Sequence, residues 1–129
     1  MIRISLASVF VADQDKALKF YTETLGFVKK HDIPMGPFRW LTVTSPAGGT
    51  EMELVLEPMA FPPAQVYQKA LRDAGVPLTA FTVDDLSKEY TRLKALGVAF
   101  KSAPQDIGPV IVAMFDDTCG NFIQLAQPK

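Results

Sequence analysis

Few side chains in this 129-residue sequence could carry out chemistry, and their types limit the kinds of site that the chain can form. His31 is the only histidine and Cys119 the only cysteine, so one chain supplies neither a two-histidine metal site nor an internal disulfide. Glu51, Glu53 and Glu57 fall on one parity of a predicted strand and would line the same wall. The residues therefore favour a carboxylate-lined pocket over a metal or thiol centre.

Composition excludes several classes of partner. Hydrophobic residues make up 48% of the chain, the net charge is −1 and the pI is near 5.7, so the sequence has no basic stripe for nucleic acid. No apolar run approaches the roughly 20 residues that span a bilayer. With a single cysteine and no recognisable leader, we expect a cytoplasmic protein that neither binds nor crosses a membrane.

The elements that must position these side chains occur twice. The stretch VADQDKALKFYTETLGF (11–27) returns in looser form as VDDLSKEYTRLKALGVAF (83–100). Each copy predicts the end of a strand, an acidic N-cap, and an amphipathic helix that stops at Leu-Gly. The predicted caps and stops are Asp13 and Gly26 for the first helix, and Asp84 or Asp85 and Gly97 for the second.

Strand–helix–three strands, repeated, predicts an α+β fold with the helices on one face of the sheets. We expect one domain over residues 1–129, with modules at 1–58 and 77–129 joined by a helix at about 62–75. Two such modules can curl into one open barrel whose concave face is a cleft. The predicted strands are 4–11, 27–33, 38–45 and 51–57, then 78–83, 98–101, 109–116 and 121–127.

Three stretches in this order resemble the vicinal oxygen chelate superfamily, which includes glyoxalase I, bleomycin-resistance proteins, fosfomycin-resistance enzymes and extradiol dioxygenases. They are the two repeats above and DDTCGNFIQL (116–125), and the resemblance covers nearly the whole chain. It implies the glyoxalase-like fold, in which two βαβββ modules form an open eight-stranded barrel-like cleft. It also implies a homodimer, sometimes with modules exchanged between chains.

The resemblance also locates the positions that hold a metal in metal-using members, one on the first and one on the last strand of each module. These positions are Leu6 and Glu53 in the first module and Leu78 and Gln124 in the second. Leucine has no donor atom, and a neutral amide oxygen is a weak donor for Zn, Ni or Fe. We therefore expect a degenerate metal site and no cofactor, and extradiol dioxygenase chemistry is excluded.

Glu53 is the candidate catalytic residue, with two alternative interpretations. Either its pKa is raised by the apolar Leu6 and Leu78 and it acts as a base or cation anchor, or it is an ordinary strand glutamate. Trp40 and two phenylalanines share strand faces that could stack on a flat ligand, although each could equally be a core residue. The predicted ligand-binding set is Leu6, Phe10, Trp40, Glu53, Leu78, Phe122 and Gln124.

His31 is expected at the surface and Cys119 as a structural thiol, and three functions stay open. The first is a small-molecule binding protein of the bleomycin-resistance type that sequesters a flat or cationic compound without a metal. The second is a glyoxalase-like lyase or isomerase that uses Glu53 as base or a weakly bound divalent metal. The third is a dimeric interaction domain with a collapsed pocket.

Overall fold

The structure is a computed structural model that describes residues 1–47 and 52–129. Glu51, which the sequence placed on the same strand face as Glu53, lies outside the described residues. The chain divides into two compact units, residues 1–65 and 66–129, and each is described by itself.

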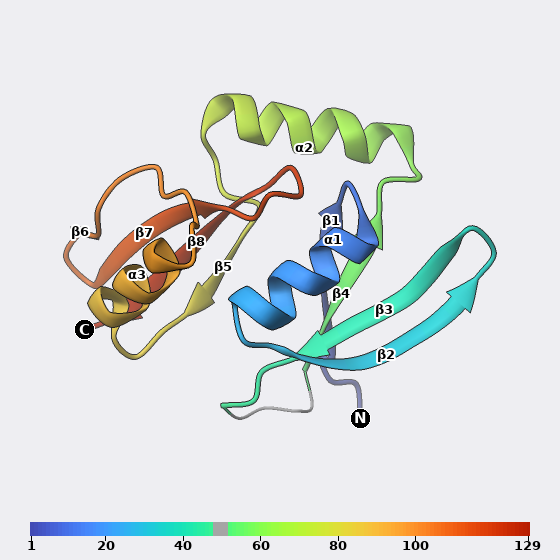
Figure 1. Cartoon of the computed structure of the whole chain (residues 1–129), viewed down its shortest axis with the longest axis horizontal. Helices are drawn as coiled ribbons and strands as arrows, with labels where there is room; N and C mark the ends of the chain where they lie inside the picture. Colours follow the sequence, from blue (N-terminus) through green and yellow to red (C-terminus); the bar gives the residue numbers. More distant parts are fainter. Residues whose placement is uncertain (48–51) are drawn as a thin grey trace. The chain divides into compact units, whose positions relative to one another are not determined.

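The first unit contains a βαβββ module whose four strands form one mixed sheet (Figure 1). The strand order is β1-β4-β3-β2, with β1 parallel to β4 and the other neighbours antiparallel. Its elements are β1 (Leu6–Val11), α1 (Gln14–Lys19), its π-helical continuation η1 (Phe20–Thr24), β2 (Val28–Met35), β3 (Phe38–Thr44) and β4 (Glu53–Pro58).

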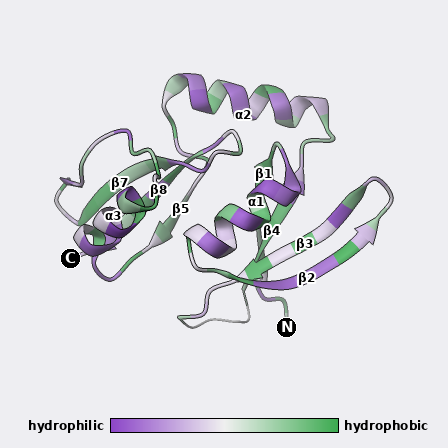
Figure 2. Ribbon diagram, viewed as in Figure 1, coloured by the Kyte–Doolittle hydropathy of each residue, from purple (hydrophilic) through white to green (hydrophobic). Residues whose placement is uncertain are grey.

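The second unit repeats the plan with the order β5-β8-β7-β6. The predicted α+β fold of two βαβββ modules with open sheets is therefore confirmed, whereas a cleft shared by both sheets stays a prediction. Helix α2 (Pro62–Ala74) begins in the first unit and ends in the second, and Figure 2 shows hydrophilic and hydrophobic bands alternating along it. The other elements are β5 (Thr79–Thr82), α3 (Leu86–Ala95), β6 (Gln105–Asp106), β7 (Val110–Asp116) and β8 (Phe122–Pro128).

Each sheet buries one face beneath its own helix. In the first unit α1 packs against β4, and Val9 and Val11 of β1 are fully buried together with Ala17 and Tyr21 of the helical segment. Leu6, on the opposite parity of β1, is 45% exposed. One face of this sheet is thus core. The other face has exposed residues such as Leu6, although Thr42 and Val55 at its centre are also buried.

In the second unit α3 packs against β7 and β8 in the same way. Leu86 and Leu93 of the helix and Phe115, Ile123 and Leu125 of the strands are buried. Phe122, Gln124 and Ala126 of β8 alternate onto the other face and are partly exposed. The apolar faces of the two predicted amphipathic helices are therefore part of the two cores.

Two predicted elements differ from the structure. No strand forms over 98–101: Val98 is buried and Phe100 makes a single bridge to Phe115, while the short β6 begins only after Pro104. These apolar residues are used as core contacts, since the Phe100 ring lies 4.7 Å from that of Tyr90 and 5.8 Å from that of Phe115. The first helix is also less regular than predicted, because its last turn is π-helical.

The predicted helix signals lie at the helix ends. Asp13 accepts a hydrogen bond from the Lys16 backbone N–H at 3.1 Å, and Asp85 accepts one from Lys88 at 3.1 Å. Of the two acidic candidates for the second helix, the cap is therefore Asp85 and not Asp84.

Asp85→Ala should lower the free energy of unfolding by about 1 kcal/mol, because the α3 backbone N–H loses its acceptor. Asp84→Ala is the matched control, and its effect should stay within about 0.5 kcal/mol. Urea unfolding of both variants measures the difference, and equal losses would show that side-chain capping is not the cause.

Candidate functional site

The candidate site is the face of the first sheet that α1 leaves uncovered, which we call the open face. The strand register aligns its residues in rows, with Glu53 beside Leu6 and Val55 beside both Ser8 and Thr42. By strand alternation the open face consists of Leu6, Ser8 and Phe10 on β1, Glu53, Val55 and Glu57 on β4, Phe38, Trp40 and Thr42 on β3, and His31, Ile33 and Met35 on β2.

The Glu53 carboxylate is engaged at both oxygens. The Thr42 hydroxyl donates a 2.9 Å hydrogen bond to Oε1, and His31 Nε2 lies 3.5 Å from the same oxygen. Lys30 Nζ lies 3.5 Å from Oε2. Glu53, Thr42, His31 and Lys30 form what we call the Glu53 cluster, and its residues come from three adjacent strands.

A β-bulge brings Lys30 and His31 to the cluster together. The pairing of β2 with β3 shifts between Lys29 and His31, so Lys30 is an extra residue in the strand. Without the bulge, successive residues would point to opposite faces of the sheet. The His31 backbone N–H instead donates to the Thr42 hydroxyl at 3.2 Å, so Thr42 links the bulge to the carboxylate.

The predicted electrostatics of Glu53 are wrong. We expected burial beside leucines to raise its pKa, but the Thr42 hydrogen bond, assisted by the nearby Lys30 and His31, lowers the pKa below its usual value of 4.5 and outweighs desolvation. His31 is at the surface as expected, with its side chain 41% exposed, and its Nε2 also faces this carboxylate. Glu53 is therefore a poor general base near neutral pH.

Two members of the cluster were missed by sequence reasoning. Thr42 shares the parity of Trp40 and lies opposite Val55 on the strand next to Glu53, so a correct strand register would have found it. Lys30 gave no such signal. Its position depends on a bulge that alternation of residue types does not reveal.

The donor set does not fit the divalent metal of metal-using relatives. Leu6, directly opposite Glu53 in the sheet, has no donor atom, and the Lys30 ammonium already occupies the second carboxylate oxygen. His31 adds one nitrogen, which leaves two donors beside a cation. Within residues 1–47 and 52–129 no three His, Cys, Asp or Glu side chains are grouped to hold a metal ion.

Apart from the buried Val55 and the polar Ser8 and Glu57, the rest of the open face is apolar and partly exposed. Trp40 lies opposite Ile33, and Phe10 lies opposite Glu57; both aromatic residues are partly buried. Four further apolar side chains are between 39% and 58% exposed: Phe38, Leu6, Ile33 and Met35. Leu6, Phe10, Trp40 and Glu53 of the predicted set are thus on one face of one sheet, and their ligand-binding role stays a prediction.

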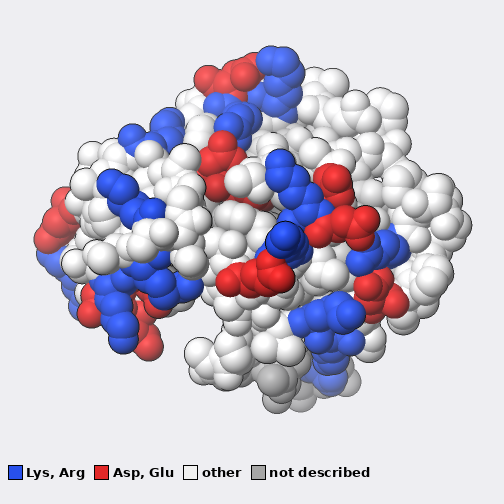
Figure 3. Space-filling view, viewed as in Figure 1, with Lys and Arg blue, Asp and Glu red and all other residues white. Residues whose placement is uncertain are grey.

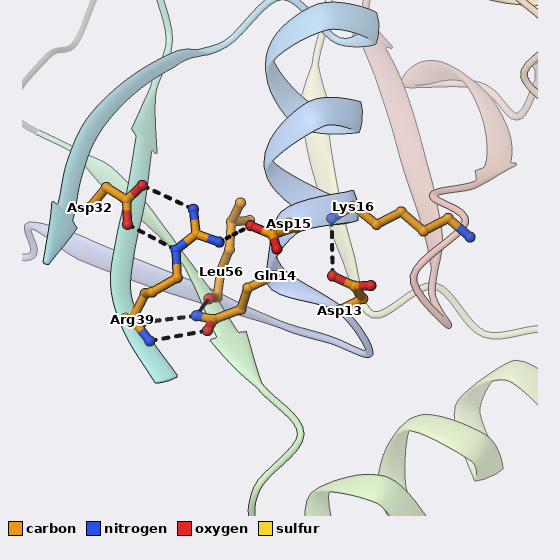
Figure 4. Close-up of polar contacts among 7 residues, drawn as sticks. All are labelled: Asp13, Gln14, Asp15, Lys16, Asp32, Arg39 and Leu56. Carbon is orange, nitrogen blue, oxygen red and sulfur yellow. Dashed lines mark hydrogen bonds and ion pairs between the residues drawn. The ribbon is translucent and has the colours of Figure 1, made fainter. Parts of the chain in front are cut away.

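The opposite face of the same sheet is tied to α1 by polar contacts (Figure 4). The Gln14 side chain donates to the backbone carbonyls of Arg39 (2.8 Å) and Leu56 (2.9 Å) and accepts from the Arg39 N–H (3.1 Å). The Arg39 guanidinium pairs with Asp32 at 2.9 Å and with Asp15 of the helix. These contacts set which face of β3 is covered, and so present Trp40 on the open face.

A cavity of about 360 Å³ lies at the carboxyl ends of β1 and β4, five residues along these strands from Leu6 and Glu53. It adjoins the polar contacts of Figure 4, and Phe38 of the open face also lines it. Its lining residues are Val11, Ala12, Asp13, Gln14, Asp15, Pro37, Phe38, Arg39, Pro58 and Met59.

The predicted site residues of the second unit are arranged differently. We expected Leu78 beside Gln124, as Leu6 is beside Glu53, but the register places Ala80 opposite Gln124 and shows the Leu78 N–H bonded to the Phe122 carbonyl. The residue beside Leu78 is therefore Phe122, two residues before Gln124. Phe122 has the Arg72 guanidinium 4.6 Å and the Lys101 ammonium 5.0 Å from its ring centre.

The charged side chains seen in Figure 3 are interspersed in sign, without a patch of one charge on the face shown. This agrees with a net charge of −1 and gives no electrostatic footprint for nucleic acid on that face. Among the described helices, none is both long and apolar enough to cross a bilayer.

Thr42→Val should raise the pKa of Glu53 towards its usual value, because the hydroxyl is the largest cause of the lowered pKa. A carboxylate with a lowered folded-state pKa adds stability above its unfolded pKa, and this stability is lost as the pH falls through the folded pKa. The wild type should therefore lose more stability between about pH 7 and about pH 3 than the variant. Carbon-13 NMR titration of Glu53 and urea unfolding at both pH values test this.

Thr44→Val is the matched control for this titration, since Thr44 is on the same strand and its hydroxyl contacts Val28 O at 3.5 Å. It should leave the Glu53 titration unchanged. If the titration midpoint of Glu53 is also unchanged in Thr42→Val, the Thr42 hydroxyl is not the cause of the lowered pKa.

Comparisons of sequence and of structure with known proteins point to the same family. Residues 3–125 match the sequence model of the Glyoxalase/Bleomycin resistance protein/Dioxygenase superfamily. The chain is 53% identical to YurT of Bacillus subtilis (strain 168), described as uncharacterized, over 98% of this chain and 99% of that protein.

Two solved structures are similar over nearly their full lengths. UcmS2 has a TM-score of 0.83 and 30% identity, with 98% of each chain covered. TnmS3, described as an antibiotic binding protein from Streptomyces sp. CB03234, has a TM-score of 0.79 and 34% identity, with 100% of this chain and 98% of that chain covered. With this fold and this match, the chain belongs to the glyoxalase/bleomycin resistance/dioxygenase (vicinal oxygen chelate) superfamily.

Proposed function

We propose that this protein binds a flat aromatic small molecule on the open face of its first unit and acts by sequestration, without a metal. The observation that carries the proposal is the exposed apolar surface there: Ile33, Met35 and Phe38 on β2 and β3 are 39% to 58% exposed beside Trp40, and Leu6 on β1, the strand of Phe10, is 45% exposed. Contiguous exposed apolar surface is characteristic of ligand-binding faces, and aromatic rings favour stacking on a flat guest.

The Glu53 cluster favours a flat guest over a cationic one. Both oxygens of Glu53 already have protein partners, one of them the Lys30 ammonium at 3.5 Å. A cationic guest would have to displace that ammonium and would gain only the difference between two similar ion pairs. Of the two guest types that the sequence suggested, the contacts thus support the flat one.

Similarity to TnmS3 supports a guest of the antibiotic kind, since the two chains are alike over their whole length. The proposal includes a homodimer, because β1 and β2 are edge strands that a second copy could cover. A binding protein also needs no catalytic group, which agrees with a Glu53 that is a poor base.

Trp40→Leu and Phe10→Leu should each weaken binding of 9-fluorenone, a neutral flat tricyclic ketone, by about three- to tenfold, because each removes a stacking ring. Isothermal titration calorimetry measures the affinities. Tyr67→Leu is the matched control, since Tyr67 is an aromatic residue of α2 that is 53% exposed. Fluorenone that fails to bind the wild type, or equal losses in all three variants, would refute the proposed face.

A second candidate function is proton abstraction from an acidic C–H, and the contact between His31 and Glu53 favours it. Because Glu53 has a lowered pKa, the base would be His31, with Glu53 orienting its ring. On this function the protein would convert the hemithioacetal of methylglyoxal and glutathione to lactoylglutathione. His31→Gln would abolish that activity and Lys29→Gln would not; a wild type without turnover removes this candidate.

A further inference from the structure

From the Glu53 cluster we infer the chemistry of the guest's polar end: it carries an acceptor oxygen, a carboxylate or a ketone, that is bound by Lys30 and His31. This inference rests on the proposed binding of a flat compound at the open face. It replaces the expectation that Glu53 anchors a cation.

Exposure within the cluster decides which groups a guest can reach. The side chains of Lys30 and His31 are each 41% exposed, whereas that of Glu53 is only 16% exposed. The carboxylate therefore lies beneath the two nitrogen-bearing side chains. A compound arriving on the open face meets hydrogen-bond donors before it meets the acid.

The Lys30 ammonium of the cluster can also donate further hydrogen bonds. An ammonium has three N–H groups, and the only ion pair of Lys30 in the described part of the chain is the 3.5 Å contact with Glu53. Glu53, by contrast, accepts from the Thr42 hydroxyl and faces two nitrogen groups. The unused hydrogen-bonding groups that a guest can most easily reach are therefore the N–H groups of the exposed Lys30, which call for an acceptor on the guest.

The placement of these donors suits a flat acid or ketone. His31 of β2 and Thr42 of β3 form one row of the open face. Ile33 and Trp40 of the same two strands form the next row. Rows two residues apart along a strand are about 7 Å apart. A bicyclic aromatic compound over Trp40 and Ile33 thus reaches the cluster with a substituent on its outer ring.

The test compares three probes with the same ring system: 2-naphthoate, 2-acetylnaphthalene and 2-naphthylmethylammonium. Calorimetry at low salt should give the tightest binding for the naphthoate and the weakest for the ammonium probe. Lys30→Gln should weaken naphthoate binding about fivefold, because an ion pair at a partly exposed site is lost. Lys29→Gln is the matched control on the other face of the sheet and should change nothing.

Glu53→Gln gives the sharpest contrast. It should strengthen naphthoate binding severalfold, because it releases Lys30 and removes a negative charge; Glu23→Gln, an exposed glutamate of the helical segment η1 outside the open face, should not.

If the ammonium probe binds tightest and Glu53→Gln weakens it, the inference is overturned and the cation anchor is restored. Equal affinity for all three probes overturns the inference and leaves the proposed function standing. Failure of all three to bind counts against both.

Discussion

The structure of the first unit depends on one constraint, the two-residue alternation of a sheet that has a helix on only one side. Val9 and Val11 must face α1, so Phe10 must face away from it, and the same parity extends across the sheet to Trp40 and Glu53 through the strand register. A slip of one residue would exchange the two faces completely. The polar contacts of Gln14 and Arg39 with α1, β3 and β4 act against such a slip, because they are made only in this register.

A local departure from that alternation brings the charged groups of the Glu53 cluster together. The bulge between Lys29 and His31 lets Lys30 and His31 reach the same carboxylate, and the hydroxyl of Thr42 connects the displaced His31 N–H to Glu53. The partners of Glu53 are an ammonium, an imidazole and a hydroxyl. A chain with the family fold thus presents a cluster of donor groups around an acid.

The two units show how far a repeat can diverge. Both place a helix over a four-stranded mixed sheet, but Leu78 lies beside Phe122, whereas Leu6 lies beside Glu53. The second unit instead surrounds Phe122 with Arg72 and Lys101. A neutral glutamine and cations near an aromatic ring are a different environment from the Glu53 cluster. The open face of the first unit is therefore the better candidate for specific recognition.

The sequence by itself determined the α+β class, both βαβββ modules, the Asp13 cap, the sheet face of Glu53 and the family, because periodicity and caps are local signals. It predicted the wrong direction for the pKa of Glu53, put a strand at 98–101 and gave no sign of the contact between His31 and Glu53. Those outcomes depend on contacts between residues far apart in the sequence: Thr42 of β3 with Glu53 of the adjacent β4, and Phe115 with Phe100. They also depend on a bulge that residue types do not signal. Only the tertiary structure decided them, since the free energy of a charge depends on the neighbours that packing brings to it.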